Sequence, residues 1–427
     1  MPAQVPNCQL ARLTGHTGEP HHPPQSNLSC LAFVLVQPLF LTPLKVALNH
    51  ACTGSNTDFN HTGPINALTY SAGAGQYLLS GSSDRSINLY NPSKAISAGN
   101  STTSSFITSS SATATRPSST PAAKKSAAHP GLIQSYSGPH THEILSIAVS
   151  ASNATFLSSG GDRAFFLWDV ATAKTVRRFG GGAAGGHAGR VDCVCFGGED
   201  EGVVCSGSYD ASVRLWDVKA GAGGGGGGKP MMVLGEARDG VMSVFCRGWE
   251  VVAGGVDGRV RTYDIRMGVC YVDVIGGMPV LSTAIRPATC DSNANSTNYT
   301  LDPITSLTPS TTDASALLIS TLTSTLRLLD RANGTLLKTY THPSYLNTTY
   351  RTRSTFASND ALVLAGSEDG YVYAWDVLTA EMVGRVKHVV EEDEGRVARS
   401  GRRLVGALAW RGGRGGDWAS AGGDGMF

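Results

Sequence analysis

One short pattern recurs along the chain and limits what it can fold into. Residues 205–217 read CSGSYDASVRLWD, in which two alternating segments flank a turn at residues 208–210. Alternation with period two on both sides of such a turn is typical of a β-hairpin. The pattern returns around Asp84, Asp162, Asp257, Thr323, Asp369 and Asp424. In all copies but the last, the turn residue and the end of the second strand lie seven positions apart, as Asp210 and Asp217 do, which indicates a repeated module.

The repeat length predicts the type of module. Without four interrupting stretches (residues 18–62, 92–131, 221–228 and 288–311), about 44 residues remain for each of the repeats, within the roughly 40 to 45 of a four-stranded propeller blade. The sequence therefore predicts an all-β fold, a single seven-bladed β-propeller over residues 1–427 with disordered loop insertions. The predicted blade repeats are 63–91, 132–169, 186–217, 238–264, 277–330, 342–376 and 401–427.

The interrupting stretches have compositions that do not favour a packed core. Residues 92–131 are rich in Ser, Thr, Ala and Pro, residues 221–228 are glycine except for Ala222, and residues 288–311 are rich in Asn, Ser and Thr, so we expect disorder in all three. The stretch 18–62 contains an apolar run at 28–48 whose only charge is Lys45. A membrane anchor, a loose loop and a translated intervening sequence are all open hypotheses for it, and no membrane partner is predicted.

Charge and cysteine content exclude some functions. The formal net charge is +1, whereas proteins that bind nucleic acid by bulk electrostatics carry a basic domain or stripe, so no direct nucleic-acid binding is expected. The nine cysteines lack paired zinc spacings. Cys193 and Cys195 lie two apart, on one face of a strand, where small core residues are the simplest interpretation. This pattern favours a reducing compartment, and the predicted localisation is cytoplasmic and nuclear.

The repeats resemble the WD-repeat β-propeller family. The residues that carry the resemblance are Gly186 with His187, Trp168 with Asp169, Trp216 with Asp217, and Trp375 with Asp376. In the third repeat the resemblance implies a hydrogen-bonded structural tetrad of His187, Ser206, Asp210 and Trp216. The turn residues Asp84, Asp162, Asp257, Asp369 and Asp424 are implied to act in the same way. The resemblance also implies that residues 9–13 supply a closing strand to the last blade.

A narrower resemblance extends through the loops. Residues 235–244, 256–268, 324–340 and 366–376 are similar to the mitogen-activated protein kinase organizer family. This similarity implies a non-catalytic scaffold that assembles kinase-cascade components, as a monomer within complexes. Members of the family are also found with the spliceosome, so a part in pre-mRNA splicing is one alternative. The segment YDIR at 263–266 is similar to the box that joins some propellers to cullin ring ubiquitin ligases, so a substrate receptor is another.

No enzyme motif accompanies these features. The sequence contains no GxSxG, GxxxxGK[ST] or HExxH, and a turn Asp that recurs in nearly every repeat indicates architecture, since a catalytic group would be unique. We therefore predict no catalytic residue, no cofactor and no metal. Partner-binding residues are predicted where charge exceeds what a blade needs, because exposed arginines are favoured interface anchors. These residues are Arg238, Asp239, Arg259, Arg261 and Arg266.

Overall fold

The protein is an assembly of antiparallel sheets. A computed structural model describes residues 61–93, 131–181, 185–219, 229–275, 302–312, 315–388, 404–411 and 417–423. All of them fall in one compact unit, residues 43–427, and the other unit, Met1–Thr42, lies outside the described residues. Every labelled element is a β-strand, and the strands form six sheets of four strands and one sheet of two.

The four-stranded sheets are blades that follow the chain in order. The first holds β1 (Ile65–Tyr70), β2 (Leu78–Ser82), β3 (Ile87–Tyr90) and β4 (Leu132–Tyr136), and the second holds β5 (Ile144–Val149), β6 (Thr155–Gly160), β7 (Ala164–Asp169) and β8 (Thr175–Gly180). The third holds β9 (Val191–Gly197), β10 (Val203–Ser208), β11 (Val213–Asp217) and β12 (Met232–Leu234), and the fourth holds β13 (Val241–Arg247), β14 (Glu250–Gly255), β15 (Arg259–Asp264) and β16 (Val269–Val274).

The remaining strands continue this order. The fifth blade holds β17 (Ile304–Pro309), β18 (Ala316–Thr321), β19 (Thr325–Asp330) and β20 (Leu336–Tyr340), and the sixth holds β21 (Ser354–Ala357), β22 (Leu362–Gly366), β23 (Tyr371–Asp376) and β24 (Met382–Lys387). The two-stranded sheet pairs β25 (Val405–Trp410) with β26 (Trp418–Gly422).

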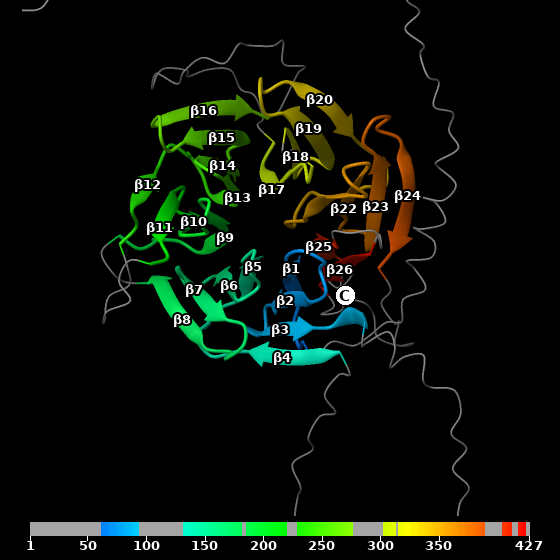
Figure 1. The fold of residues 1–427 in the computed structure, drawn as a ribbon. Helices are drawn as coiled ribbons and strands as arrows, with labels where there is room; N and C mark the ends of the chain where they lie inside the picture. The colour runs from blue at the N-terminus through cyan, green and yellow to red at the C-terminus, as the bar shows by residue number, and fades with distance from the viewer. Residues whose placement is uncertain are drawn as a thin grey trace, which may run out of the picture. The chain divides into compact units, whose positions relative to one another are not determined.

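The sheets are arranged around a centre. The first strand of each sheet contacts the first strand of the next, and β25 contacts β1, which closes the circuit. Figure 1 shows these strands around the middle and the fourth strands, such as β4, β16 and β24, at the outside. This is a β-propeller arrangement, as the sequence predicted.

The predicted number of blades is wrong. The described residues form six four-stranded blades, not seven, and the seventh repeat, predicted at 401–427, contributes only the two-stranded sheet of β25 and β26. The repeat count treated each hairpin signal as a whole blade, although a hairpin supplies only part of the four strands that a blade needs. Asp424 and residues 9–13, predicted for the last turn and the closing strand, lie outside the described residues.

One predicted insert contains a strand. Residues 304–309 of the predicted insert 288–311 form β17, the innermost strand of the fifth blade. Its sequence, ITSLTP, carries apolar side chains at only two positions besides the terminal proline, so composition alone suggested a loop. The structure also shows that repeat and blade are offset, because β4 falls in the repeat predicted at 132–169 yet pairs with β3 of the first blade.

The other predicted inserts fall largely outside the described residues. Of residues 18–62, 92–131 and 221–228, the structure describes only 61–62, 92–93 and 131. Within the described part of the chain, no helix is long and apolar enough to cross a membrane. The apolar run at 28–48 is not part of that description, so the hypotheses for it stay open.

Apolar side chains from neighbouring blades pack between the sheets. Phe165 and Phe179 of the second blade stack with their ring centroids 4.7 Å apart. The ring of Trp216, from the third blade, meets Phe165 edge-on at 5.5 Å. All three side chains are almost fully buried. Each such side chain contributes about 1.5–3 kcal/mol by burial, and because the clusters span two sheets, they hold successive blades together.

Glycine near the end of the second strand permits close backbone packing. A β-carbon built on Gly160 of β6 would lie 2.1 Å from the carbonyl oxygen of Glu143, just before β5. Gly160 pairs with Ile144, the residue after Glu143, and Gly161 N–H donates to the Glu143 carbonyl, so the backbone on neither side can easily move. We expect Gly160→Ala to lower the free energy of unfolding by about 1–3 kcal/mol or more, as overpacking does, in urea denaturation of the full chain.

Gly202 offers a matched control, because an added β-carbon there would meet no atom within 4 Å. We expect Gly202→Ala to change stability by no more than about 0.5 kcal/mol. Equal effects of the two substitutions would contradict the packing explanation.

Candidate functional site

The turns that carry the repeated Asp lie at one end of each blade. In the fourth blade, Val241 at the start of β13 pairs with Gly255 at the end of β14. The turn after β14, with Asp257, and the segment before β13 therefore share one end of the sheet. We call this end the turn-Asp face. The turn-Asp ends of neighbouring blades lie side by side, since Gly207, near the end of β10 in the third blade, lies against Val241 of the fourth.

The third blade has a chain of side-chain hydrogen bonds at this face. Trp216 Nε1 donates to Ser206 Oγ at 2.8 Å, and Ser206 Oγ lies 2.8 Å from His187 Nε2. His187 Nδ1 lies 3.0 Å from Asp210 Oδ2. The structure thus brings together all members of the tetrad that the resemblance implied. They connect a core tryptophan to the turn through a nearly buried histidine.

The direction of this chain fixes the protonation of the histidine. The indole N–H donates to the serine oxygen, so the serine hydroxyl can donate to His187 Nε2, which lies nearer than its other acceptor, the Arg214 carbonyl at 3.4 Å, and Nδ1–H then donates to Asp210. Burial lowers the pKa of His187, and this effect outweighs the opposing hydrogen bond that His187 donates to Asp210. Burial opposes ionisation of Asp210, yet hydrogen bonds from His187 and Ser212 hold its pKa below the usual range. The pair is therefore a neutral imidazole and a carboxylate at pH 7.

The second blade has the same network around a histidine that the sequence analysis missed. His140 Nδ1 lies 2.6 Å from Asp162 Oδ2, and its Nε2 lies 2.7 Å from Ser158 Oγ, which also accepts from Trp168 Nε1 at 2.8 Å. Proline precedes His140 where glycine precedes His187, and the spacing to the turn Asp is one residue shorter. The sequence feature that could have identified this network is a histidine about 22 residues before the turn Asp.

Other blades hold the turn Asp in different ways. In the first blade, His61 lies 2.9 Å from Asp84 and 2.7 Å from Ser80, with Tyr90 in place of the tryptophan. In the sixth, the Tyr373 hydroxyl donates to Asp369 at 2.7 Å. In the fifth, hydroxyls replace the carboxylate, and Thr323 lies 3.1 Å from Thr325.

The fourth blade uses an arginine, which corrects a prediction. Arg261 pairs with Asp257 through both guanidinium nitrogens, and its side chain is only 3% exposed. Arg261 was predicted as an exposed partner-binding residue, but it takes the place of the absent histidine. Its burial could not be predicted from the sequence, because an arginine four residues after the turn Asp also fits an exposed strand position.

The other predicted partner-binding residues do not form one site. Arg238 and Asp239 are exposed and Arg259 is half-buried, all at the turn-Asp face of the fourth blade. Arg266 is exposed in the turn between β15 and β16, at the opposite end. That turn also contains the end of the YDIR segment, whose Tyr263 is buried in β15.

An exposed aromatic residue extends the charged surface beside Arg238. Tyr209, in the turn of the third blade, is 56% exposed. The guanidinium of Arg190 lies 4.9 Å from its ring centroid. A β-carbon at Gly240, next to Asp239, would lie 3.0 Å from Tyr209 Cδ2, so the ring rests on the fourth blade. We define the Tyr209 patch as Arg190, Tyr209, Arg238, Asp239 and Arg259.

Metal-ligating groups, thiols and carboxylates are the other candidates for chemistry among the described residues. They contain no group of three or more His, Cys, Asp or Glu placed to hold a metal ion. Burial raises the pKa of Cys193 to about 12, so this thiol stays protonated at pH 7. The turn carboxylates that were followed above are hydrogen-bonded within their own blades, as structural groups are.

Comparisons with known proteins agree with the repeat architecture. The family model described as WD domain, G-beta repeat matches residues 53–91, 131–169 and 182–217, so the chain carries WD40 repeats, as predicted. It is 25% identical over 357 residues to the WD repeat domain-containing protein 83 homolog of Dictyostelium discoideum, covering 77% of this chain and 86% of that protein.

Other similarities cover shorter stretches. The chain is 36% identical over 154 residues to WD repeat domain-containing protein 83 of Rattus norvegicus, covering 36% of this chain and 40% of that protein. It is 32% identical over 120 residues to the guanine nucleotide-binding protein subunit beta of Arabidopsis thaliana, covering 28% and 31% of the two chains. These matches span well under two thirds of either relative.

The tetrad suggests a comparison between two buried tryptophans. Trp216 Nε1 donates to Ser206, whereas the equivalent Trp375 Nε1 has no hydrogen-bond partner among the residues that the structure describes. Replacement by Phe removes similar volume at both sites, so the difference isolates the hydrogen bond. We expect Trp216→Phe to cost about 1 kcal/mol more unfolding free energy than Trp375→Phe, by urea denaturation. Equal losses would contradict a stabilising tetrad.

The neutral histidines predict a dependence of stability on pH. The pKa values of His140 and His187 are lowered in the folded state, chiefly by burial, so below about pH 6.5 the unfolded chain binds more protons than the folded one. Hydrogen bonds from Thr141, His140 and His142 outweigh burial and hold the pKa of Asp162 at about 2, which adds a loss between about pH 4 and 2. We expect the unfolding free energy to fall as pH decreases from about 6.5.

Chemical denaturation at a series of pH values, with NMR titration of the histidine rings, would measure this effect. The double variant His140→Gln, His187→Gln should show a weaker pH dependence between pH 6.5 and 4.5. A folded-state pKa for His187 above 6.5 would contradict the assigned protonation.

Proposed function

We propose that this chain is a non-catalytic scaffold that holds components of a protein kinase cascade at its turn-Asp face. The observation that carries the proposal is the Tyr209 patch, an exposed aromatic ring with arginines beside it. Aromatic and arginine side chains are the residues most enriched among interface hot spots. The similarity to proteins named WD repeat domain-containing protein 83 supports a shared mode of action.

The patch is built on a rigid base, which favours binding. The backbone N–H of Tyr209 donates to the carbonyl of Arg190 at 3.0 Å, and the adjacent Asp210 is held by His187. The turn that presents the ring is therefore fixed before any partner arrives. A preorganised surface loses less conformational entropy on binding than a mobile loop does.

The proposed mechanism is simultaneous docking. A kinase and its substrate that occupy separate positions on one propeller meet at an effective concentration set by the distance between them, in the millimolar range for short tethers. The scaffold then raises the rate of their encounter without contributing a catalytic group. Propeller blades repeat around the centre, so one face offers several such positions.

The narrower alternatives would use other surfaces or partners. A cullin ring ligase receptor that docks through the YDIR segment would depend on Arg266, which lies at the end of the blade opposite the Tyr209 patch. A splicing role would bring spliceosomal proteins. The cytoplasmic and nuclear localisation stays a prediction in each case.

Affinity purification from the native cell, followed by mass spectrometry, tests the proposal. We expect kinases of one cascade to copurify with the full chain. The double variant Tyr209→Ala, Arg238→Glu should lose at least one of them about tenfold or more, because an exposed hot-spot residue contributes about 2 kcal/mol to binding. Both side chains are exposed, so circular dichroism and melting temperature should change little.

The control variant combines Trp249→Ala and Arg266→Glu. It removes an exposed aromatic ring and reverses an exposed arginine in the same blade, at the opposite end. We expect it to retain the kinases. Loss of the kinases with the control variant alone would contradict binding at the turn-Asp face and place the contact at the opposite end. Copurification of spliceosomal or cullin components without kinases would contradict the kinase assignment.

A further inference from the structure

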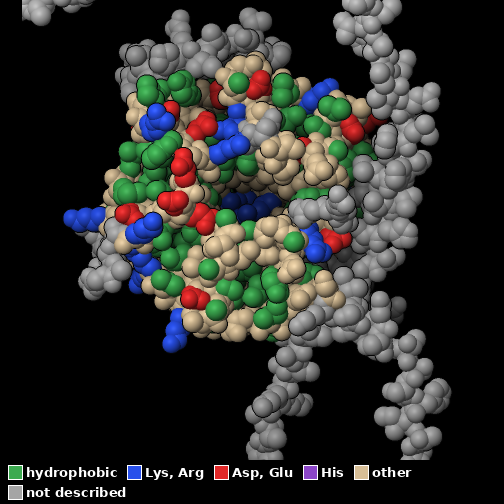
Figure 2. All heavy atoms as spheres, viewed as in Figure 1, with side chains coloured by type: hydrophobic (Ala, Val, Ile, Leu, Met, Phe, Trp, Pro, Cys, Tyr) green, Lys and Arg blue, Asp and Glu red, His purple; other side chains and the backbone are tan. Residues whose placement is uncertain are grey.

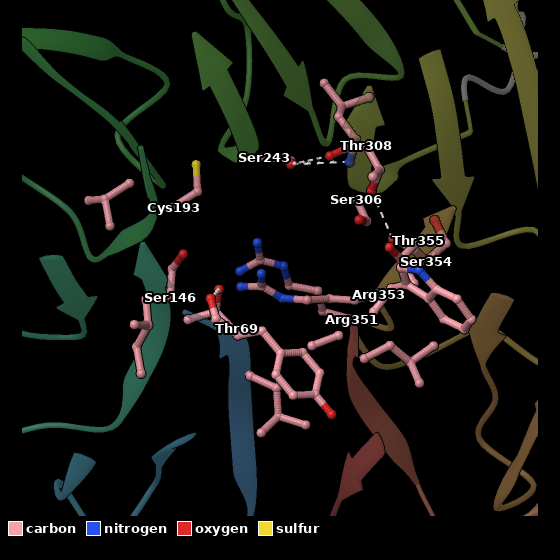
Figure 3. Close-up of a pocket in the computed structure, with 18 of the residues that line it drawn as sticks. Thr69, Ser146, Cys193, Ser243, Ser306, Thr308, Arg351, Arg353, Ser354 and Thr355 are labelled. Carbon is pink, nitrogen blue, oxygen red and sulfur yellow. Dashed lines mark hydrogen bonds between the residues drawn. The ribbon is translucent and has the colours of Figure 1, made fainter. Parts of the chain in front are cut away.

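The centre of the propeller contains a polar cavity of about 360 Å³. Hydroxyl groups of the inner strands line it, among them Thr69, Ser146, Ser243, Ser306 and Thr355, together with the Cys193 thiol. Figure 3 shows these side chains around a central space that the guanidinium groups of Arg351 and Arg353 enter. The space-filling view in Figure 2 shows blue side chains at the bottom of the central hollow.

The two arginines come from the segment just before β21. Arg351 donates to three backbone carbonyls, those of Thr305, Asp192 and Met242, which belong to three different blades. Arg353 donates through one terminal nitrogen to the carbonyl of Leu145 at 3.0 Å. A guanidinium has five N–H donors, so within the described part of the chain Arg353 retains donors that can serve a ligand.

The lining holds two positive charges and no carboxylate. The described residues around the cavity include neither Asp nor Glu. Asp192 is not among the lining residues, and its carboxylate pairs with Arg190. Its backbone carbonyl accepts from Arg351, and burial raises the pKa of its carboxyl although the nearby charge of Arg351 opposes this. Burial, and then the charge of Arg351, lower the pKa of Arg353 to about 9, so it remains charged at pH 7. Two like charges in a buried site, with no carboxylate among the described lining residues, favour the binding of an anion.

We propose that this cavity binds a small organic phosphate through Arg351 and Arg353. Planar guanidinium groups match the oxygens of a phosphate group, and two of them match the double charge of a phosphate monoester. The surrounding hydroxyls can donate to further oxygens or to the organic part. The volume lies in the range of about 300–1,000 Å³ that is usual for small-molecule sites.

A second cavity shares Arg351 and Arg353 with this site. It has a volume of about 140 Å³ and is lined by Pro64, Asn66 and Tyr350 as well as by Arg351 and Arg353. Pro64 and Tyr350 lie in segments that precede inner strands, and Tyr350 is 47% exposed. Arg351 and Arg353 therefore line both the central cavity and the second cavity, which lies toward the face that carries the Tyr209 patch.

Binding of defined probes to the full chain tests the proposal. The probes are myo-inositol hexakisphosphate, ATP and inorganic phosphate, with uncharged myo-inositol as the blank, in calorimetry and thermal-shift measurements at low salt. We expect at least one organic phosphate to bind and to raise the melting temperature, and myo-inositol to do neither. Absence of binding by both organic phosphates would overturn the proposal, and equally tight binding of inorganic phosphate would overturn the assignment to an organic ligand.

Charge variants show where the probe binds. We expect Arg353→Met to weaken binding about tenfold or more, because charge-assisted hydrogen bonds are lost. Its ligand-free melting temperature should not fall much, since a like-charge repulsion is also removed. The matched control is Arg385→Met, which removes an exposed arginine from β24 of the same blade and should retain binding. Equal weakening by both variants would indicate a general charge effect and overturn the proposal.

Thr69→Asp provides a test that leaves both arginines in place. It adds a carboxylate to the cavity lining, which should pair with the arginines and weaken the organic phosphate about tenfold or more, and should not lower the ligand-free melting temperature. Unchanged binding in this variant would overturn the proposal even if Arg353→Met failed to fold.

Discussion

The burial of each sheet against the next is the interaction on which the rest of the structure depends. No blade has a core of its own, because a single twisted sheet cannot bury either of its two apolar faces without a neighbouring sheet. The cluster that contains Phe165, Phe179 and Trp216 is formed by two blades together. The glycines near the ends of the second strands serve the same packing, since Gly207 lies directly against Val241 of the next blade. A side chain at that position would hold the two sheets apart.

This packing buries polar groups at the turn-Asp face, and different blades supply different hydrogen-bond partners for them. A turn that crosses the end of a sheet presents backbone N–H groups and a carboxylate close to the core, and these groups need partners when they are buried. His187 and His140 meet this need through a serine and a tryptophan, Arg261 through an ion pair, and Tyr373 through its hydroxyl. The fold therefore requires a partner for the turn, and the identity of that partner varies.

The sequence predicted those parts of the fold that follow from local periodicity. The hairpin signal around Asp210 correctly predicted β10 and β11. It did not predict the number of complete blades, because strand pairing at the edge of a sheet is a long-range property that a hairpin motif does not encode. The strand β17 was missed because its Ser and Thr side chains resemble a loop. Arg261 was misassigned because burial depends on the neighbouring strand. Arg351 and Arg353 lie in the repeat predicted at 342–376 but outside its hairpin pattern around Asp369.

Those two arginines follow from the geometry of the inner strands. Each first strand is the edge of its sheet, so the backbone groups on its central side have no neighbouring strand to pair with. Arg351 is long enough to cross the centre, and it donates to carbonyls near β9, β13 and β17 at once. The hydrogen bonds of Arg351 go to neutral carbonyls, and no carboxylate is among the described residues that line the cavity with it. The same arginine side chains can therefore pair the free backbone carbonyls of the inner strands and create an anion site. Their charge lies at the centre, which the inner strands surround.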